Sequence, residues 1–241
     1  MKHTCPFCDT HTLYHLNDGR LECVTCKRRF SPKKQQKNRQ IIDAFLKGLT
    51  AKETSLVYKI SFPTVFEKYS LFRQLITLYL EAIYRQKDET FSEYEEYLFL
   101  PRSKRGDPKF LLEGIGIMAM NKKEYVYTLL MPDHFNRYQY QYLQDGIEHV
   151  ANKELASYLH WNKISKLETF DTPLTKFWYF LETFMGKFHG VRREYFSDYL
   201  KEAEFRFNYT HDEQEKILIK LWKEYEANPK KGQLHLYNIT K

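Results

Sequence analysis

The 241-residue sequence has few glycines, prolines and cysteines, and it has no long apolar run. Nine glycines and eight prolines are too few for a fibrous or low-complexity protein. No stretch reaches the roughly 18 consecutive apolar residues of a membrane-spanning helix, and the residues after Met1 lack the apolar core of a secretory signal. We therefore expect a cytoplasmic protein, associated with the nucleoid if it binds DNA, and no membrane partner.

Charge is distributed unevenly along the chain. Residues 1–88 contain 16 Lys and Arg against 8 Asp and Glu, whereas residues 89–241 contain 22 against 23. The net charge of +7 therefore originates in the N-terminal third. Such an asymmetry is typical of a polyanion-binding segment attached to a nearly neutral body, although a solvated basic surface gives the same counts.

The four cysteines form a C-x2-C-x14-C-x2-C pattern near the N-terminus. They are Cys5, Cys8, Cys23 and Cys26. Each C-x-x-C directs two thiolates to one point, and two such pairs complete the tetrahedral four-sulfur shell of a structural Zn²⁺ site. Two disulfides are the alternative, which a reducing cytoplasm disfavours. The spacing therefore predicts a zinc ribbon over residues 1–30.

The segment between the two cysteine pairs is expected to be a short hairpin. Thr12–Leu16 and Arg20–Glu22 are its strands, and Asn17-Asp18-Gly19 is its turn, where Asn and Gly tolerate positive φ. A segment this small has no core of its own. We therefore expect zinc binding and folding of the ribbon to be one event.

A basic and almost wholly polar segment follows the ribbon. Seven of the thirteen residues from Lys27 to Arg39 are Lys or Arg. We predict a flexible linker over residues 31–39 that contacts DNA phosphates, which position a protein on DNA without reading its sequence. A plain solvated linker is the alternative. The residues assigned to phosphate contacts are Lys27, Arg28, Arg29, Lys33, Lys34, Lys37 and Arg39.

Residues 40–86 are predicted to form a helix-turn-helix, of which the first two helices have clear boundaries. Helical spacing over Ile41–Leu46 stops at Gly48, a residue typical of helix C-termini. Thr50-Ala51-Lys52-Glu53 is a capping box that begins a second helix. We expect Leu56 and Val57 to lie on the apolar face of that helix.

A third helix follows a short turn. Ser61 is its expected N-cap, and Pro63 falls in its first turn. The N-terminal residues of the last helix of such a motif enter the major groove of DNA. The alternative is three-helix packing without a role in DNA binding. The candidate base or phosphate contacts are Thr64, Glu67, Lys68 and Arg73.

From about residue 90 the pattern changes to strands followed by helices. Their order predicts an α/β or α+β domain. The basic turn 102–106 and the turn Asn121-Lys122-Lys123 separate the strands, and Asp171-Thr172-Pro173 begins a helix. The expected strands are Phe91–Leu100, Phe110–Met120 and Tyr125–Met131; the expected helices are Phe135–Leu143, Pro173–Gly186, Tyr195–Phe207 and His211–Tyr225, with a weak element near His149–Leu159.

Short sequence blocks add a family resemblance to this organisation. They are Phe45-Leu46-Lys47-Gly48-Leu49-Thr50, Thr64-Val65 followed by Phe72-Arg73, Val126-Tyr127-Thr128 with Pro132, Phe177-Trp178, Lys187-Phe188-His189-Gly190-Val191 and Phe205-Arg206-Phe207-Asn208. Together with the ribbon, they make the chain resemble the zinc-ribbon insertion-sequence transposases related to the Merlin group. The resemblance covers nearly the whole chain. It implies a ribonuclease-H-like DDE catalytic domain over residues 90–227, a mixed sheet with helices, followed by a tail over 228–241.

The family's chemistry uses three acidic residues to hold two Mg²⁺ ions at a DNA phosphodiester. Its first acid aligns with Glu95, one methylene longer than the usual Asp. Its second acid has two registers: one gives Asp133, and the other falls near Asn152 or Lys153. Neither Asn nor Lys is a substitute for a carboxylate that bridges metal ions.

The third acid position of the family holds Thr175, an uncharged and weak metal ligand. The Lys that follows it in the family is replaced by Glu182. Asp171 and Glu182 are possible substitutes for the missing acid, but a helix N-cap and an exposed helix carboxylate explain them more simply. The catalytic candidates are therefore Glu95 and Asp133 alone.

These observations predict a transposase-like protein that recognises transposon-end or related double-stranded DNA, with little or no strand-transfer activity. One alternative is an active DDE-type transposase that cleaves and joins DNA with Mg²⁺. A second is a protein-interaction module that uses the ribbon and the aromatic helices as docking surfaces. The resemblance also implies a homodimer on paired DNA ends.

Overall fold

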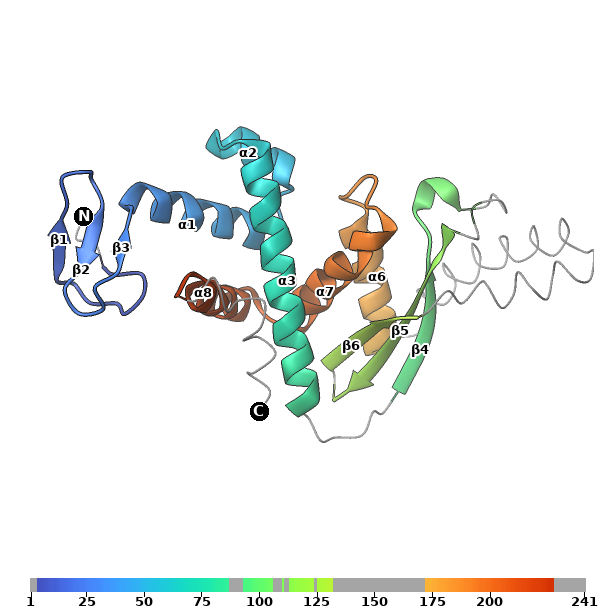
Figure 1. The fold of residues 1–241 in the computed structure, drawn as a ribbon. Coiled ribbons are helices and arrows are strands. Elements are labelled where there is room, and N and C mark those ends of the chain that lie inside the picture. The colour runs from blue at the N-terminus through green and yellow to red at the C-terminus, as the bar shows by residue number, and fades with distance from the viewer. Residues whose placement is uncertain are drawn as a thin grey trace, which may run out of the picture. The chain divides into compact units, whose positions relative to one another are not determined.

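The computed structural model shows a mixed α+β protein in two units. One unit consists of residues 1–86 and 209–241, and the other of residues 87–208. Figure 1 labels their helices and strands in chain order. None of the helices in the described part is long and apolar enough to cross a membrane. The structure describes residues 4–86, 93–105, 110, 113–123, 125–131 and 172–227.

A small antiparallel sheet begins the first unit. It contains β1 (Leu13–His15), β2 (Leu21–Cys23) and β3 (Arg29–Phe30) in that order. The predicted hairpin is confirmed, and Gly19 in its turn has a φ of +76°, which an L side chain rarely adopts. The third strand was not predicted, because two residues are too few for a period-2 pattern.

Helix α1 (Pro32–Leu46) begins inside the segment that we expected to be a flexible linker. The side chain of Ser31 caps it by accepting a hydrogen bond from the backbone N–H of Lys34, and a proline occupies its first turn. Residues 32–39 are therefore helical. The hydrophobic spacing predicted only the C-terminal part of this helix.

The N-terminal half of α1 packs through polar groups. This explains why apolar residues do not recur at helical spacing in that part of the sequence. Asn38 is buried, and its amide donates a hydrogen bond of 3.0 Å to Glu226 on α8 (His211–Ala227). The side-chain amide of Gln35 donates to the same carboxylate at 3.3 Å. These partners are far apart in the sequence, so no local pattern reveals them.

The end of α1 and the start of α2 (Ala51–Tyr58) follow the predicted chemistry. Gly48 has a φ of +74°. Its N–H donates to the carbonyl of Phe45, and that of Leu49 donates to Ala44, which is the Schellman arrangement. The Thr50–Glu53 capping box is present with both of its hydrogen bonds.

Helix α3 (Phe62–Gln86) runs through the centre of the first unit. Its Tyr69 and Phe72 pack edge-on against Phe45 of α1, with ring centroids 4.9 and 5.4 Å apart. Phe72 also meets Trp222 of α8 edge-on at 5.5 Å. Helix α8 therefore completes the core formed by α1 and α3, whereas its place in the sequence predicted that it belongs to the domain over 90–227. An amphipathic pattern shows that a helix has an apolar face but not which core that face meets.

The expected apolar face of α2 is not buried. Leu56 and Val57 are 71% and 63% exposed. The side of α2 that faces the core presents Thr54 instead, which is fully buried and shares a 2.7 Å hydrogen bond with the hydroxyl of Tyr69. The prediction for Leu56 and Val57 was wrong. The side of α2 that packs on the core carries a hydrogen-bonded threonine and not the aliphatic side chains that we expected there.

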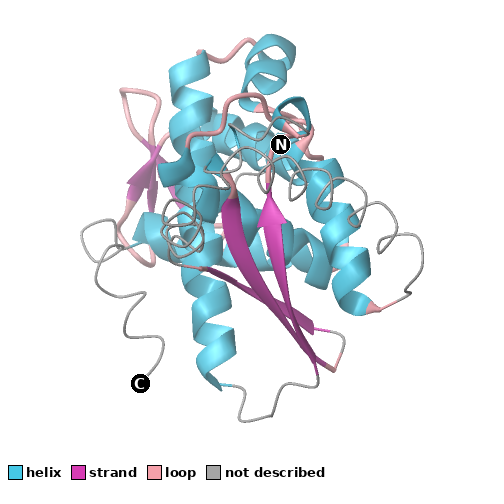
Figure 2. Ribbon diagram, turned by 90° about the vertical axis from the view of Figure 1, so that its right-hand side faces the viewer, coloured by secondary structure: helices cyan, strands magenta, loops and turns pink. Residues whose placement is uncertain are grey.

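The second unit contains a three-stranded antiparallel sheet (Figure 2). Its strands are β4 (Glu93–Phe99), β5 (Ile115–Lys122) and β6 (Tyr125–Leu130). All three were predicted, although β5 begins later than expected and continues through Lys122. Ala119 in β5 is paired with Glu95 on one side and with Thr128 on the other.

Two helices pack against this sheet. Helix α6 (Pro173–Met185) contacts all three strands, and α7 (Phe196–Asn208) packs on β6. The indole of Trp178 stacks on the ring of Tyr97 with centroids 4.4 Å apart. Thr172, and not Asp171, is the N-cap of α6. Two short 3₁₀ helices, Arg102–Lys104 and Arg193–Tyr195, complete the described elements of this unit.

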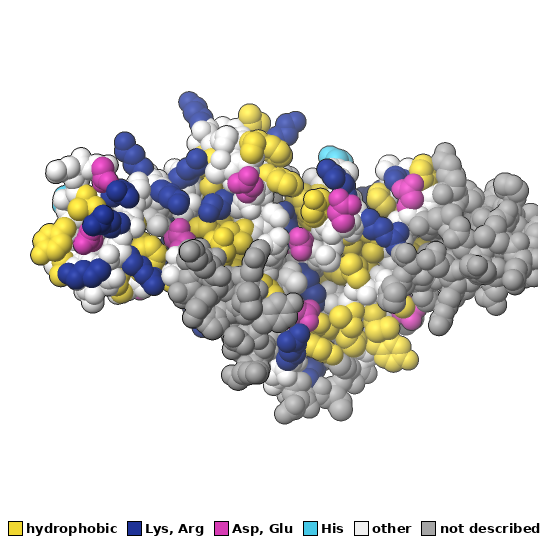
Figure 3. Space-filling model, viewed as in Figure 1, with side chains coloured by type: hydrophobic (Ala, Val, Ile, Leu, Met, Phe, Trp, Pro, Cys, Tyr) yellow, Lys and Arg dark blue, Asp and Glu magenta, His cyan; other side chains and the backbone are white. Residues whose placement is uncertain are grey.

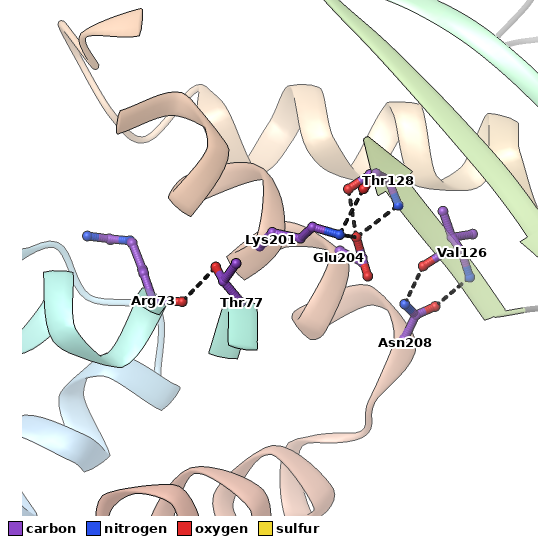
Figure 4. Close-up of polar contacts among 7 residues, drawn as sticks. All are labelled: Arg73, Thr77, Val126, Thr128, Lys201, Glu204 and Asn208. Atoms are coloured by element: carbon purple, nitrogen blue, oxygen red, sulfur yellow. Dashed lines mark hydrogen bonds and ion pairs between the residues drawn. The ribbon is translucent and has the colours of Figure 1, made fainter. Parts of the chain in front are cut away.

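Side chains of α7 satisfy the outer backbone groups of β6 (Figure 4). The amide of Asn208 accepts from the N–H of Val126 at 2.8 Å and donates to its carbonyl at 2.6 Å. The carboxylate of Glu204 accepts from both the N–H and the hydroxyl of Thr128, and the ammonium of Lys201 donates to the Thr128 carbonyl at 2.8 Å. Because the backbone N–H and carbonyl groups of Val126 and Thr128 are hydrogen-bonded to α7, they are not available to pair with an added strand.

Replacing Lys201 by Met is expected to lower the free energy of unfolding by about 3 kcal/mol. The ammonium of Lys201 lies 3.0 Å from the carboxylate of Glu204, and their side chains are 8% and 0% exposed. The variant leaves Glu204 buried without its cationic partner. Urea unfolding followed by circular dichroism measures the change. Lys187→Met, at an exposed lysine of the same unit, is the control and should change stability by less than about 0.5 kcal/mol; equal effects of the two variants would contradict this account of the β6 edge.

Candidate functional site

The two C-x-x-C segments adopt the same backbone conformation. In each, the N–H of the residue after the second cysteine donates to the carbonyl of the first: Asp9 to Cys5 at 3.0 Å, and Lys27 to Cys23 at 2.9 Å. Asp9 and Lys27 both have a φ of +56°, a left-handed conformation that is uncommon for residues with a side chain. The tight turn aims both thiols of each pair toward the same point.

The four sulfur atoms form a compact cluster. The Sγ atoms of Cys5 and Cys26 are 3.6 Å apart, those of Cys8 and Cys23 are 3.5 Å apart, and all four lie within 4.8 Å of one another. A tetrahedral shell with Zn–S bonds of about 2.3 Å has sulfur–sulfur separations of about 3.8 Å. A disulfide needs about 2.05 Å, and the cysteines are free. The predicted cluster is confirmed, and its donor set and spacing fit a structural Zn²⁺ ion.

The protonation of the thiols differs within the cluster. Burial raises the pKa of Cys5 to about 12. Hydrogen bonds with the hydroxyl and backbone of Thr10 lower the pKa of Cys8 to about 6. The backbone N–H of Cys26 lowers the pKa of Cys23. A metal ion binds thiolates, so the ion would displace the proton of Cys5, and zinc uptake is coupled to proton release.

Little besides the cluster holds the ribbon together. Its buried apolar residues are Cys5, Leu21, Cys23 and Phe30. The ring of Phe7 meets that of Phe30 edge-on at 6.3 Å, and the guanidinium of Arg28 lies 5.0 Å from the Phe7 ring. A core of this size does not offset the loss of chain entropy without metal coordination.

The predicted phosphate contacts divide into exposed and partnered residues. Lys27, Lys33 and Lys34 are exposed, and Lys37 is partly exposed. Figure 3 shows Lys and Arg side chains gathered over the ribbon and over α1 and α2. These lysines meet the first condition for a phosphate contact, which is access to solvent.

The predicted arginine contacts have partners within the protein. Arg29 forms an ion pair of 2.6 Å with Glu22. Arg39 lies 3.0 Å from Glu215 of α8 and 3.6 Å from Asp43. These arginines fix the local fold and remain at least half exposed, at 58% and 56% of their side-chain areas.

Two of the predicted contacts on α3 pack against aromatic rings of the same unit, Arg73 buried and Lys68 partly exposed. Arg73 is 4% exposed and lies between Phe45 and Tyr69, with its guanidinium carbon 5.9 Å from each ring centroid. The prediction of Arg73 as a DNA contact was wrong, because the long side chain folds back into the helical core. The backbone carbonyl of Arg73 accepts a hydrogen bond from the hydroxyl of Thr77 (Figure 4). The ammonium of Lys68 lies 4.1 Å from the ring of Trp222, and burial lowers its pKa.

The beginning of α3 presents other groups to solvent. Glu67 is exposed, and Thr64 is partly exposed with its hydroxyl 2.7 Å from that of Ser61. Two exposed aromatic residues beside them, Phe62 and Phe66, were not among the predicted contacts. Their spacing of four was visible in the sequence, but a pair of aromatics on a helix is usually part of a core.

The described catalytic candidates make structural contacts. Glu95 on β4 accepts a hydrogen bond of 3.1 Å from the indole N–H of Trp178. The hydroxyl of Thr175 shares the capping box of α6 with Thr172. Glu182 is 6% exposed and bonds both Tyr97 and Arg105. The expectation of an exposed helix carboxylate at Glu182 was therefore wrong, since its partners come from other elements of the unit.

Asp133, Asp171, Asn152 and Lys153 lie outside the described residues, as do the helix predicted over 135–143, the weak element near 149–159 and the tail from 228. Within the described ranges, the cysteines form the one group of three or more His, Cys, Asp or Glu residues spaced to hold a metal ion. No protein-family model matches the chain, and comparisons with curated proteins and with solved structures found no match.

Removing zinc from the purified protein with a strong chelator is expected to unfold the ribbon and to leave the helices folded. The reason is the small apolar core around the thiol cluster. Limited trypsin digestion measures the change, because Lys27, Arg28 and Arg29 become cleavable when the ribbon opens. The far-ultraviolet dichroism of the helices should change little.

Two variants sharpen this test. Cys8→Ser removes one thiolate, so we expect less than one zinc ion per chain by elemental analysis and trypsin sensitivity without chelator. Thr25→Ala changes an exposed residue between Cys23 and Cys26 and should retain the metal. A protein whose trypsin resistance is the same with and without zinc would contradict a structural metal site.

Proposed function

We propose that this protein is a transposase-like DNA-binding protein that contacts double-stranded DNA through its zinc ribbon, α1 and the start of α3. The observation that carries the proposal is the charge of the unit that contains these elements. Residues 1–86 and 209–241 contain 21 Lys and Arg against 12 Asp and Glu, a net charge of +9, whereas residues 87–208 contain 17 against 19. A strongly basic unit that contains a helix-turn-helix is typical of DNA binding.

The first turn of α1 supports a phosphate contact. It contains Lys33 and Lys34 and no acidic residue. Cations at a helix N-terminus are unfavourable, because the helix macrodipole is already positive there. A DNA phosphate at this end would be attracted by both lysines and by the positive end of the helix macrodipole. The arrangement costs stability in the absence of an anion and favours binding in its presence.

The arrangement of the three helices supports a groove contact. The short α2 is joined to α3 through Lys59, which has a φ of +51° and is the αL C-cap of α2. The buried Ile60 fixes the turn beneath the two helices. The N-terminal residues of α3 are consequently exposed on a rigid element, as a recognition helix requires.

The second unit supports the resemblance to a transposase scaffold without its chemistry. Its antiparallel three-stranded sheet, crossed by α6, is compatible with the start of a ribonuclease-H-like domain. A two-metal site needs carboxylates that are open to the ions. Thr175 is a capping residue, and Glu182 is engaged with Arg105. We therefore propose binding without strand transfer.

Neutralising Lys33 and Lys34 together, as Lys33→Gln and Lys34→Gln in one chain, is expected to weaken binding to a mixed-sequence duplex by about 10- to 100-fold at 0.1 M salt. The slope of log K against log salt concentration should become smaller by about two, because two phosphate contacts are lost. Fluorescence anisotropy titrations at several salt concentrations measure both quantities.

The control variant carries Lys216→Gln and Lys220→Gln, two exposed lysines of α8 in the same unit. It has the same net charge as the test variant, so an effect of overall charge alone would appear equally in both. Equal losses would contradict a contact at α1. Binding of the unaltered protein that does not depend on salt, or no binding at all, would contradict the proposed function.

A further inference from the structure

The start of α3 exposes two large aromatic rings. Phe62 and Phe66 are 48% and 45% exposed, and their rings stack with centroids 5.8 Å apart and planes inclined by 30°. The next positions toward the core, Val65 and Tyr69, are 0% and 1% exposed. The helix therefore buries a complete apolar face and still presents a second apolar surface to water. Such a surface is unfavourable unless something covers it.

The surroundings of these rings indicate what covers them. Lys52 on α2 and Lys59 in the turn are exposed. Figure 3 shows hydrophobic side chains over α2 and the start of α3 with Lys and Arg side chains beside them. Exposed lysines beside apolar side chains complement a DNA groove, in which phosphates form the edge and bases the floor. A second copy of this chain would bring a unit with the same net charge of +9 to this surface and be repelled.

The chemistry of the exposed residues limits what they are able to read. Phe62, Pro63 and Phe66 have no side-chain donor or acceptor, so they do not recognise the hydrogen-bonding edge of a base. The apolar feature of the major groove is the C5-methyl group of thymine. Glu67, exposed on the same turn, is an acceptor suited to the amino group of cytosine.

We propose that Phe62 and Phe66 recognise thymine through its C5-methyl group in the major groove. This inference rests on the proposed function, because it assigns the bases that the DNA-binding unit reads. The rings are held by the packing of α3 and by each other, so their position does not have to be ordered on binding. The preferred site should contain thymine at the positions that the two rings cover.

Uracil substitution tests the proposal directly. The full chain with zinc first selects duplexes from a random-sequence pool, and the selected duplex is then resynthesised with uracil in place of thymine at one position at a time. Uracil keeps the base pair and removes only the methyl group. Anisotropy titrations should show about fourfold weaker binding per contacted methyl group and roughly tenfold or more for two.

The variant Phe62→Ala with Phe66→Ala assigns the effect to these rings. It should bind the thymine duplex roughly tenfold more weakly and lose less than twofold on uracil substitution. Tyr179→Ala removes a ring that is 66% exposed on α6 and should keep the full uracil effect. Circular dichroism confirms folding of each variant, and the single variant Phe66→Ala serves if the double variant does not fold.

The outcomes separate this inference from the proposed function. Binding that falls with uracil in the unaltered protein and not in the phenylalanine variant supports the proposal. Salt-dependent binding that is unaffected by uracil overturns it and leaves DNA binding in place, and so does an equal uracil effect in the phenylalanine variant. A dimer that the phenylalanine variant abolishes, with uracil-insensitive DNA binding, would assign the surface to a second copy. Failure to bind any duplex overturns both proposals.

Discussion

The unit of residues 1–86 and 209–241 depends on the packing of its last helix against its first and third. Trp222 of α8 meets Phe72 of α3, and Glu226 accepts hydrogen bonds from Gln35 and Asn38 of α1. Between α3 and α8 the chain forms the whole second unit. The contact of α8 with α1 therefore joins segments that are almost two hundred residues apart in sequence. It explains how a helix with many polar residues is held at a fixed place after the zinc ribbon.

This constraint also determines which basic groups are left for a ligand. Glu215 of α8 forms an ion pair with Arg39, and the ammonium of Lys68 lies against the indole of Trp222. Lys33 and Lys34 lie in the first turn of α1 and are exposed. The protein thus uses part of its positive charge to assemble the unit and leaves Lys33 and Lys34 exposed at a helix N-terminus, where an anion is most favourable.

The features that the sequence predicted correctly are those whose physical cause is local. The cysteine spacing and the ends of helices at Gly48 and Thr50 depend on residues a few positions apart. The first half of α1 was missed because Asn38 is buried by a hydrogen bond to Glu226 and not by apolar contact. Glu182 was expected in solvent because its partners belong to other elements. A polar contact between residues that are far apart in the sequence produces no repeating pattern of residue types, so a single sequence does not reveal it.

Hydrogen exchange of the full chain, with and without bound duplex DNA, reports which segments the DNA covers and so tests the proposed binding surface. On DNA binding we expect slower exchange over the two C-x-x-C turns of the ribbon, the first turn of α1 and the start of α3, and unchanged exchange over residues 172–208. Protection confined to residues 93–131 and 172–208 would contradict it, because the DNA would then be bound by the unit that carries no excess of positive charge.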